Sequence, residues 1–307
     1  MLSKTVIVIV GPTAIGKTAV SINIAKKSNC PVLSADSRQF FKEMTIGTAK
    51  PSVEEMQGVP HYFINSHTIT DDYNVGKFET ESIALLEELF KTHNQVIVVG
   101  GSGLYIDALC KGFDELPEAD TEVREKIQSV LISEGIEGLQ HLLQEHDPEY
   151  YKKVDLNNPQ RLSRAIEVCL TTGIPYSQFR KGENKKRNFN IIKIGLNTDR
   201  ESLYERINKR VDEMISSGLA DEVKSLVSYK HLNALQTVGY KELFDHFDNK
   251  TDLLTAINLI KQNTRRFAKR QLTWFRRDEE ITWFKPNEQE KILEFITKRI
   301  SNNERSV

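Results

Sequence analysis

Cysteine is scarce in this chain of 307 residues. The three cysteines, Cys30, Cys110 and Cys169, are odd in number and lie far apart in the sequence. Their spacing matches neither a zinc site nor the disulfide framework of a small secreted domain. A chain of this length buries enough apolar surface to fold without such cross-links. We therefore expect a protein of a reducing compartment.

Long hydrophobic runs are missing as well. No apolar stretch approaches the ~18 residues that a membrane-spanning helix needs. The apolar run at Thr5–Val10 is too short for the core of a secretory signal, and no cleavage site follows it. We therefore predict no membrane association, and we expect a monomeric protein in the cytoplasm.

Net charge is almost absent, since 42 basic and 43 acidic side chains sum to −1. The total therefore gives no argument for a nucleic-acid partner. The distribution does, because no acidic residue lies between Leu253 and Arg277. Seven basic residues occupy that stretch: Lys261, Arg265, Arg266, Lys269, Arg270, Arg276 and Arg277. Such a cluster is typical of a polyanion-binding surface or of a solvated helix face, and the run alone leaves both open.

The remaining pattern is that of an α/β protein. Five apolar runs predict buried strands: Thr5–Val10, Pro31–Ala35, Tyr62–Ile64, Gln95–Val99 and Ile191–Leu196. Helical patterns separate these runs, as at Lys17–Ser28 and Glu79–His93. Because strands that alternate with helices form parallel sheets, we predict a parallel sheet flanked by helices.

Residues 116–187 carry no strand pattern and read as helical. Their clearest helix is Pro159–Thr172, which has proline in its first turn and glycine just after its end. We therefore predict two domains, a core formed by residues 1–115 and 188–307, and an inserted all-helical domain of residues 116–187. In the C-terminal part of the core, Leu203, Ile207 and Val211 mark one helix, and residues 251–277 another.

One motif carries chemistry by itself. Residues 11–18 fit the phosphate-loop pattern G-x-x-x-x-G-K-[ST] and lie between a buried strand and a helix. The backbone N–H groups of such a loop and the start of the helix face a phosphate group. The predicted diphosphate-binding residues are Gly11, Pro12, Thr13, Ala14, Ile15, Gly16, Lys17 and Thr18. Lys17 would stabilise the terminal phosphate during catalysis, and the Thr18 hydroxyl would bind Mg²⁺.

The second metal-binding acid of a nucleoside triphosphatase is missing from its usual place. That acid normally ends a buried strand, but Gln95–Val99 is followed by Gly-Gly-Ser-Gly. Asp36 instead follows the strand at Pro31–Ala35, at the sheet edge where α/β proteins bind ligands. We interpret Asp36 as a general base or a turn residue, and Ser102 as a candidate polar group of the same pocket.

Six motifs together resemble one family. They are GPTAIGKT, SADSRQFFKEMTIGTAKP, VVGGSGLY, NPQRLSRAIEV, VGYKEL and TRRFAKRQLTWFR, in this order. The set is similar to that of bacterial tRNA dimethylallyltransferases, the MiaA family of tRNA isopentenyltransferases. The second and the last motif are the specific ones, because generic phosphate-loop proteins lack them.

The resemblance implies a P-loop NTPase-like core with an inserted tRNA-binding helical domain. It implies transfer of a dimethylallyl group from dimethylallyl diphosphate to N6 of the adenosine 3′ of the anticodon. Asp36 would be the base for the exocyclic amine, with Mg²⁺ on the diphosphate near Thr18. The implied contacts with the tRNA anticodon stem-loop are Asp36, Ser37, Arg38, Gln39, Ser102, Arg124, Gln160, Arg161, Leu162, Ser163, Arg164, Gln236, Thr237, Val238, Gly239, Tyr240 and Lys241.

Two features of the residues leave room for other interpretations. Arg161 and Arg164 lie one helical turn apart and could equally form a solvated face, and Lys241 stands where the family usually has arginine. A small-molecule kinase would leave the basic segment unexplained, and a prenyltransferase of free adenylate would not need the helical insertion. A non-catalytic nucleic-acid-binding protein would not need Lys17, Thr18 and Asp36 intact.

Overall fold

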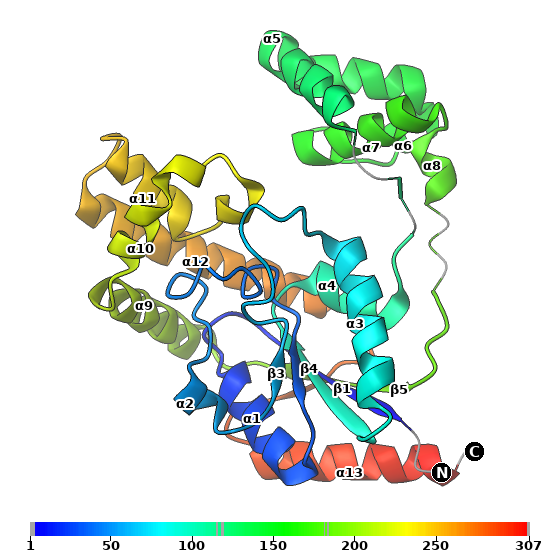
Figure 1. Cartoon of the computed structure of the whole chain (residues 1–307), viewed down its shortest axis with the longest axis vertical. Coiled ribbons are helices and arrows are strands. Elements are labelled where there is room, and N and C mark those ends of the chain that lie inside the picture. Colours follow the sequence, from blue (N-terminus) through cyan, green and yellow to red (C-terminus); the bar gives the residue numbers. More distant parts are fainter. Residues whose placement is uncertain (1–3, 115, 118–119, 181, 183, 306–307) are drawn as a thin grey trace. The chain divides into compact units, whose positions relative to one another are not determined.

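The computed structural model describes residues 4–114, 116–117, 120–180, 182 and 184–305 (Figure 1). It divides into two compact units, one of Met1–Cys110 with Lys186–Val307 and one of Lys111–Lys185. We call them the sheet unit and the helical unit. The sequence analysis places these boundaries at 115/116 and 187/188, and residue 115 lies outside the described residues.

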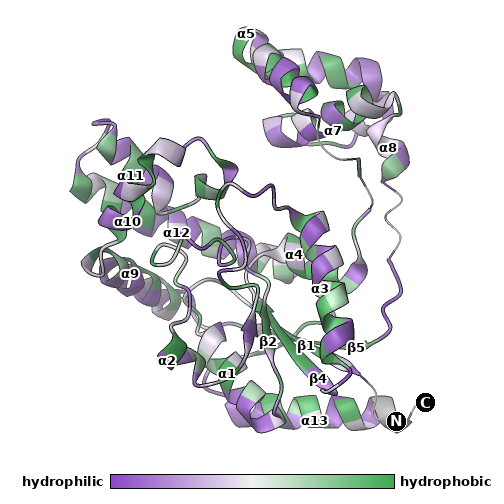
Figure 2. Cartoon of the chain, viewed as in Figure 1, coloured by the Kyte–Doolittle hydropathy of each residue, from purple (hydrophilic) through white to green (hydrophobic). Residues whose placement is uncertain are grey.

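A six-stranded parallel sheet forms the centre of the sheet unit, with the strand order β3-β2-β4-β1-β5-β6. The strands are β1 (Thr5–Val10), β2 (Val32–Ser34), β3 (His61–Tyr62), β4 (Gln95–Gly100), β5 (Asn190–Leu196) and β6 (Thr282–Phe284). Figure 2 shows the hydrophobic character of its central strands, as expected when helices cover both faces. The predicted α/β fold with a parallel sheet is confirmed, and β6 is a strand that the sequence pattern missed.

Helices of the sheet unit cover both faces of the sheet and form a further layer beyond the carboxyl ends of its strands. They are α1 (Lys17–Ser28), α2 (Val53–Met56), α3 (Val75–Leu89), α4 (Gly103–Lys111), α9 (Arg200–Ser216), α10 (Leu219–Ser225), α11 (Tyr240–Phe247), α12 (Leu253–Phe275) and α13 (Gln289–Arg305). Alternate side chains of β1 point to opposite faces. Ile7 and Ile9 pack with α1, α9 and α13, whereas Val6 and Val8 pack with α3 and α4.

A third apolar core lies beyond the carboxyl ends of the strands. Phe40, Phe41 and Met44, from the segment after β2, pack there against buried residues of α9, α10, α11 and α12. The helix predicted at residues 251–277 spans Leu253–Phe275, and at its start Asp252 caps the first turn by accepting from Thr255 N. The packing of Phe40, Phe41 and Met44 attaches the long segment after β2 to the C-terminal helices.

The helical unit has its own core. It contains α5 (Thr121–His146), α6 (Pro148–Tyr151), α7 (Pro159–Thr172) and α8 (Tyr176–Phe179), packed around residues such as Leu139, Leu143 and Leu162. The predicted bounds of α7 are confirmed, from its Asn158 cap to Gly173. Non-helical φ and ψ at Gly135 bend α5 into two arms.

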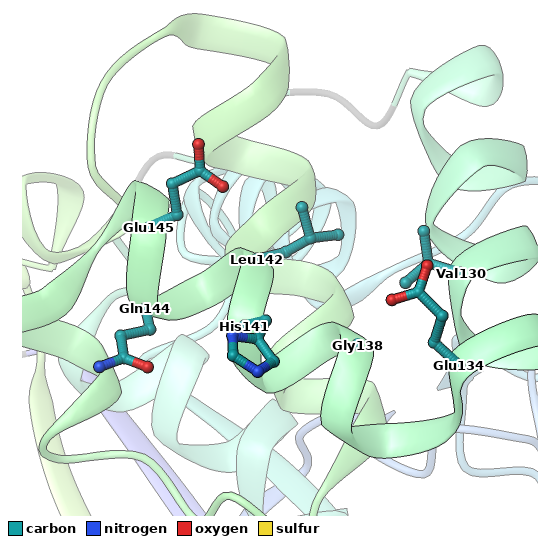
Figure 3. Close-up of a pocket in the computed structure, with 7 residues that line it drawn as sticks. All are labelled: Val130, Glu134, Gly138, His141, Leu142, Gln144 and Glu145. Atoms are coloured by element: carbon teal, nitrogen blue, oxygen red, sulfur yellow. The ribbon is translucent and has the colours of Figure 1, made fainter.

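A hollow of about 370 Å³ lies beside this bend (Figure 3). Its lining residues are Val130, Glu134, Gly138, His141, Leu142, Gln144 and Glu145, none of which is a predicted site residue. Within the described part of the chain, no helix has the length and apolar character needed to cross a membrane.

Candidate active site

Three loops meet at one edge of the sheet. The phosphate loop follows β1, the Asp36 loop follows β2, and Gly101 and Ser102 follow β4. These three strands are neighbours in the order β2-β4-β1, and parallel pairing puts their carboxyl ends at the same edge. The fold therefore brings Lys17, Asp36 and Ser102 to the same edge, as the sequence predicts.

The phosphate loop curls tightly against the neighbouring strand. Gly11 has a φ of 149°, and a Cβ atom at this position would lie 2.6 Å from the carbonyl oxygen of Leu196 at the end of β5. Only glycine fits such a close approach of two backbones. Lys17 folds back over the loop, since its Nζ donates to the carbonyl oxygens of Gly11 at 3.0 Å and Pro12 at 2.9 Å. The ammonium group is therefore held above the loop that would bind the phosphates.

The charge of Lys17 is poised near neutral pH. The pKa of Lys17 is lowered to about 8: burial lowers it most, the nearby Asp36 carboxylate raises it, and the Arg210 guanidinium also lowers it. These effects require Asp36 and Arg210 to lie near the Lys17 ammonium, because charge interactions weaken with distance. Asp36, Lys17 and Arg210 therefore belong to one site.

Helix α9 adds two arginines that the sequence analysis missed. Arg206 Nη1 donates to the carbonyl oxygen of Ile15 at 3.2 Å. One turn further along, burial lowers the pKa of Arg210, whereas Asp36 raises it. Both flank the apolar stripe of α9, and their i, i+4 spacing beside that stripe was the available signal. They concentrate positive charge where a diphosphate would lie.

The Asp36 loop is linked to the turn after β4. Ser37 N donates to the Ser102 hydroxyl at 2.9 Å, and Arg38 N donates to Asp36 Oδ1 at 2.9 Å. Burial lowers the pKa of Arg38, and both Tyr105 and Asp36 raise it, so this guanidinium also lies near the carboxylate. Ser102 is thus a link between two loops of the site.

Gln39 closes the same loop from inside the protein. Its Oε1 accepts from the Ser34 hydroxyl at 3.0 Å, and its Nε2 donates to the carbonyl oxygens of Thr48 and Ala49 at 3.2 and 3.3 Å. The amide of this predicted tRNA contact is therefore engaged within the protein.

The end of α12 holds the phosphate loop and the β4 turn together. Gln271 is 6% exposed; its Oε1 accepts from Thr13 N at 2.8 Å and its Nε2 donates to Gly101 O at 2.9 Å. One turn later, Trp274 Nε1 donates to Asp107 Oδ2 at 2.8 Å. These contacts give a structural role to the motif TRRFAKRQLTWFR, which the sequence analysis singled out for its basic charge and as one of the two family-specific motifs.

Two predicted tRNA contacts are core residues instead. Leu162 and Tyr240 are both 0% exposed, so neither offers a surface to RNA. Leu162 lies in the apolar stripe of α7. The Tyr240 hydroxyl donates to Glu222 Oε1 at 2.6 Å. Among the predicted tRNA contacts at residues 236–241, Gln236 and Lys241 are exposed, Thr237 and Val238 are half-buried, and Gly239 is buried.

In the helical unit, a buried carboxylate holds two of the predicted arginines. Glu167 is 4% exposed and accepts from Arg124 Nε at 2.6 Å and from Arg164 Nη1 at 2.8 Å. Arg164 also donates to the Pro117 carbonyl oxygen at 2.8 Å. Gln160 and Arg161 are exposed on the first turn of α7, and Ser163 is half-buried.

Comparison with known proteins decides the family. A sequence model of the family described as IPP transferase matches residues 39–278. The chain belongs to the IPP transferase family. It is 53% identical over 301 residues to a protein of Christiangramia forsetii named tRNA dimethylallyltransferase, covering 98% of this chain and 100% of that protein. It is 47% identical over 296 residues to tRNA dimethylallyltransferase 1 of Bacteroides fragilis, covering 96% and 98%.

Solved structures of the IPP transferase family agree with this fold. The tRNA isopentenylpyrophosphate transferase of Bacillus halodurans has a TM-score of 0.73 and 36% identity, with 98% of both chains covered. A eukaryotic dimethylallyltransferase described as acting on tRNA has a TM-score of 0.83 and 27% identity, with 98% of this chain and 80% of that chain covered. The match therefore extends over both units of the chain.

The lowered pKa of Lys17 predicts a pH dependence for diphosphate binding. A bound diphosphate favours the ammonium form, so binding above pH 8 must take up a proton that the free protein has lost. We expect the Kd of a prenyl diphosphate to be level below that pH and to rise about tenfold per pH unit above it. Isothermal titration calorimetry at several pH values measures this rise.

Lys17→Ala is the control for this experiment. Its binding should be weaker and should not change with pH over the same range. Burial also lowers the pKa of Lys50 to about 8. Because this lysine stays in place in the variant, any pH dependence that it causes would remain there. A wild-type Kd that does not change with pH would contradict the assignment of Lys17 as the phosphate-binding group.

Proposed function

We propose that this protein transfers a dimethylallyl group from dimethylallyl diphosphate to N6 of the adenosine 3′ of the anticodon in tRNA. The observation that carries the proposal is the proximity of Asp36 to Lys17: both lie at the same sheet edge, and the Asp36 carboxylate raises the pKa of the Lys17 ammonium. It combines a diphosphate-binding lysine with a carboxylate base at one sheet edge. Family membership supplies the class of reaction.

The leaving diphosphate needs stabilisation, because the bond from the allylic carbon to oxygen breaks as negative charge develops on that oxygen. Lys17, the loop N–H groups and the guanidinium groups of Arg206 and Arg210 supply preorganised positive charge for it. Lys17 would exchange its contacts with the Gly11 and Pro12 carbonyl oxygens for the phosphate. The allylic carbon becomes electrophilic as the diphosphate departs.

The incoming amine needs a proton acceptor. An exocyclic amine of adenine is a weak nucleophile, because its lone pair is delocalised into the ring. Asp36 takes the N6 proton as the new bond from nitrogen to carbon forms. Ser102 acts from the other side of the loop by accepting from Ser37 N, which holds the backbone next to the base in place.

Mg²⁺ suits the donor set of this site. Among the described residues, no group of three or more His, Cys, Asp or Glu side chains could hold a metal ion by itself. Mg²⁺ often keeps several waters and binds substrate phosphates with few protein ligands, so the Thr18 hydroxyl and the diphosphate oxygens fit it. When bound, it would neutralise charge on the leaving diphosphate.

The tRNA is proposed to contact both units. Exposed or half-buried candidates in the sheet unit are Asp36, Ser37, Arg38, Gln39, Ser102, Gln236, Thr237, Val238 and Lys241, and those in the helical unit are Arg124, Gln160, Arg161, Ser163 and Arg164. Extracting the target base from its stack would let it reach Asp36. A monomer in the cytoplasm, where tRNA is modified, fits this role.

One incubation tests the proposal. Protein, Mg²⁺, dimethylallyl diphosphate and unmodified tRNA should yield N6-dimethylallyladenosine, detected by mass spectrometry after nuclease digestion. Free adenylate in place of tRNA should give no prenylated product, and ATP in place of the prenyl donor should leave the tRNA unmodified. Turnover of ATP or prenylation of free adenylate would favour the competing interpretations.

Asp36→Asn tests the base. Asparagine keeps the side-chain oxygen that accepts from Arg38 N, so the loop should keep its shape. Without the carboxylate, the single-turnover rate at saturating tRNA should fall by roughly 10²-fold or more, with prenyl diphosphate still bound. The assay belongs near neutral pH, because loss of Asp36 also lowers the pKa of Lys17. A rate near that of the wild type would mean that Asp36 only positions the target adenine and does not accept its proton.

Arg161→Ala tests the helical unit as an RNA-binding surface. Arg161 is exposed, and loss of one phosphate contact should reduce the log–log salt slope of tRNA binding by about one. Lys153→Ala is the matched control, since it removes one exposed positive charge from the same unit and Lys153 already pairs with Glu149 at 3.5 Å. Equal slopes for both variants and the wild type would identify Arg161 as part of a solvated face.

A further inference from the structure

A carboxylate of α10 lies in a cluster of four donors. Glu222 Oε2 accepts from the backbone N–H groups of Thr45 at 3.0 Å and Ile46 at 2.7 Å, and its Oε1 accepts from that of Gly47 at 3.0 Å. Oε1 also accepts from the Tyr240 hydroxyl at 2.6 Å. Consecutive N–H groups that converge in this way form a nest for an anion. Here a side chain of the protein itself fills the nest.

The Tyr240 ring supports the same turn from α11. A Cβ atom at Gly47 would lie 2.5 Å from Tyr240 Cε2, so the ring and the turn pack with no space between them. Tyr240 is fully buried in the core that also holds Phe40, Phe41 and Met44. Ring packing and the hydrogen bond through Glu222 therefore fix one turn from two helices.

This turn is connected to the loop that carries Asp36. The chain continues directly from Gly47 to Thr48 and Ala49, whose carbonyl oxygens accept from Gln39 Nε2. Gln39 also accepts from the Ser34 hydroxyl, so it spans the loop between Ser34 and itself. Asp36 lies within that span. A displacement of the 45–47 turn would move the carbonyl oxygens that hold Gln39.

We propose that Glu222 and Tyr240 are positioning residues, and that together they hold the Asp36 loop in the geometry that removes the N6 proton. The proposal rests on the proposed function for the identity of the reaction. It gives the tyrosine of the VGYKEL motif a role that needs no contact with RNA. A carboxylate suits this role because it accepts several hydrogen bonds at once, and its charge strengthens each of them.

Tyr240→Phe is the mildest test, because it keeps the ring against Gly47 and removes only the hydroxyl. We expect kcat at saturating tRNA to fall by about tenfold, since small misplacements of a catalytic group have large kinetic effects. Glu222→Gln should have a larger effect, because an amide presents N–H donors to a nest of donors. The KM for dimethylallyl diphosphate should stay within about twofold in both variants, since neither residue touches the phosphate loop.

A double-mutant cycle with Asp36→Asn separates positioning from general stability. If Tyr240 acts through Asp36, adding Tyr240→Phe to Asp36→Asn should lower the rate little further, because the two changes impair one function. Asp248→Asn is the control at the other end of α11, at an exposed residue directly after the helix. It removes ion pairs with Lys230 and Lys250 and leaves the 45–47 turn untouched. Independent effects of the Tyr240 and Asp36 substitutions would overturn the proposal.

Hydrogen exchange tests, without reference to activity, whether Glu222 and Tyr240 hold the Asp36 loop. Peptides that cover residues 36–49 should exchange faster in Tyr240→Phe and Glu222→Gln than in the wild type and in Asp248→Asn. Unchanged exchange in these peptides would overturn the proposal even if the wild type transfers no prenyl group. If exchange is faster in the two variants but the wild type produces no N6-dimethylallyladenosine, the positioning role of Glu222 and Tyr240 is retained and the proposed function is refuted.

Discussion

Parallel pairing of β2, β4 and β1 is the constraint from which the candidate site follows. It places three loops at one sheet edge. It does not fix their positions relative to one another, because strand pairing constrains only the strands and not the loops that follow them. Side chains from distant parts of the chain supply that fixation. Ser102 joins the β4 turn to the Asp36 loop, and Gln271 joins the phosphate loop to the β4 turn.

The buried side chains that fix these loops are costly to leave unpaired. Gln271 is almost fully buried, and both ends of its amide are paired with backbone groups. Loss of such a partner leaves a buried donor and a buried acceptor without a hydrogen bond, which lowers the free energy of unfolding by about 1–3 kcal/mol for each group. Glu222 is half-buried, and its loss would leave the part-buried N–H groups of Ile46 and Gly47 without their acceptor. Side chains from other parts of the chain therefore hold both the Asp36 loop and the phosphate loop.

Local patterns predicted the parts of the site that depend on local sequence. The phosphate loop is a contiguous motif, and Asp36 follows an apolar run, so both could be placed at the ends of predicted strands. The i, i+4 spacing of Arg206 and Arg210 marks them as neighbours on one helix, but neither they nor Glu222 could be placed in the site in this way, because their partners are distant in the sequence. Their function depends on how α9 and α10 pack, which hydrophobic periodicity alone does not specify.

The resemblance to a family carried a different kind of error. It transferred whole motifs, and a motif contains packing residues as well as contacts. Leu162 and Tyr240 lie inside such motifs and are fully buried. For Leu162 the apolar stripe of Pro159–Thr172 already indicated burial. For Tyr240 the decisive partner, Glu222, lies in another helix and could not be inferred from the motif.

Helix α12 divides its basic run between packing and surface exposure. Lys261 pairs with Asp212 at 2.6 Å, and Arg265 donates to Asn208 at 2.6 Å, so the first basic residues serve the packing of α12 on α9. Lys269 and Arg270 are exposed further along, where the buried face carries Gln271. One helix thus holds the phosphate loop with its inner face and presents positive charge with its outer face. Because the two faces share one rigid element, a polyanion bound outside and a diphosphate bound inside would act on the same helix.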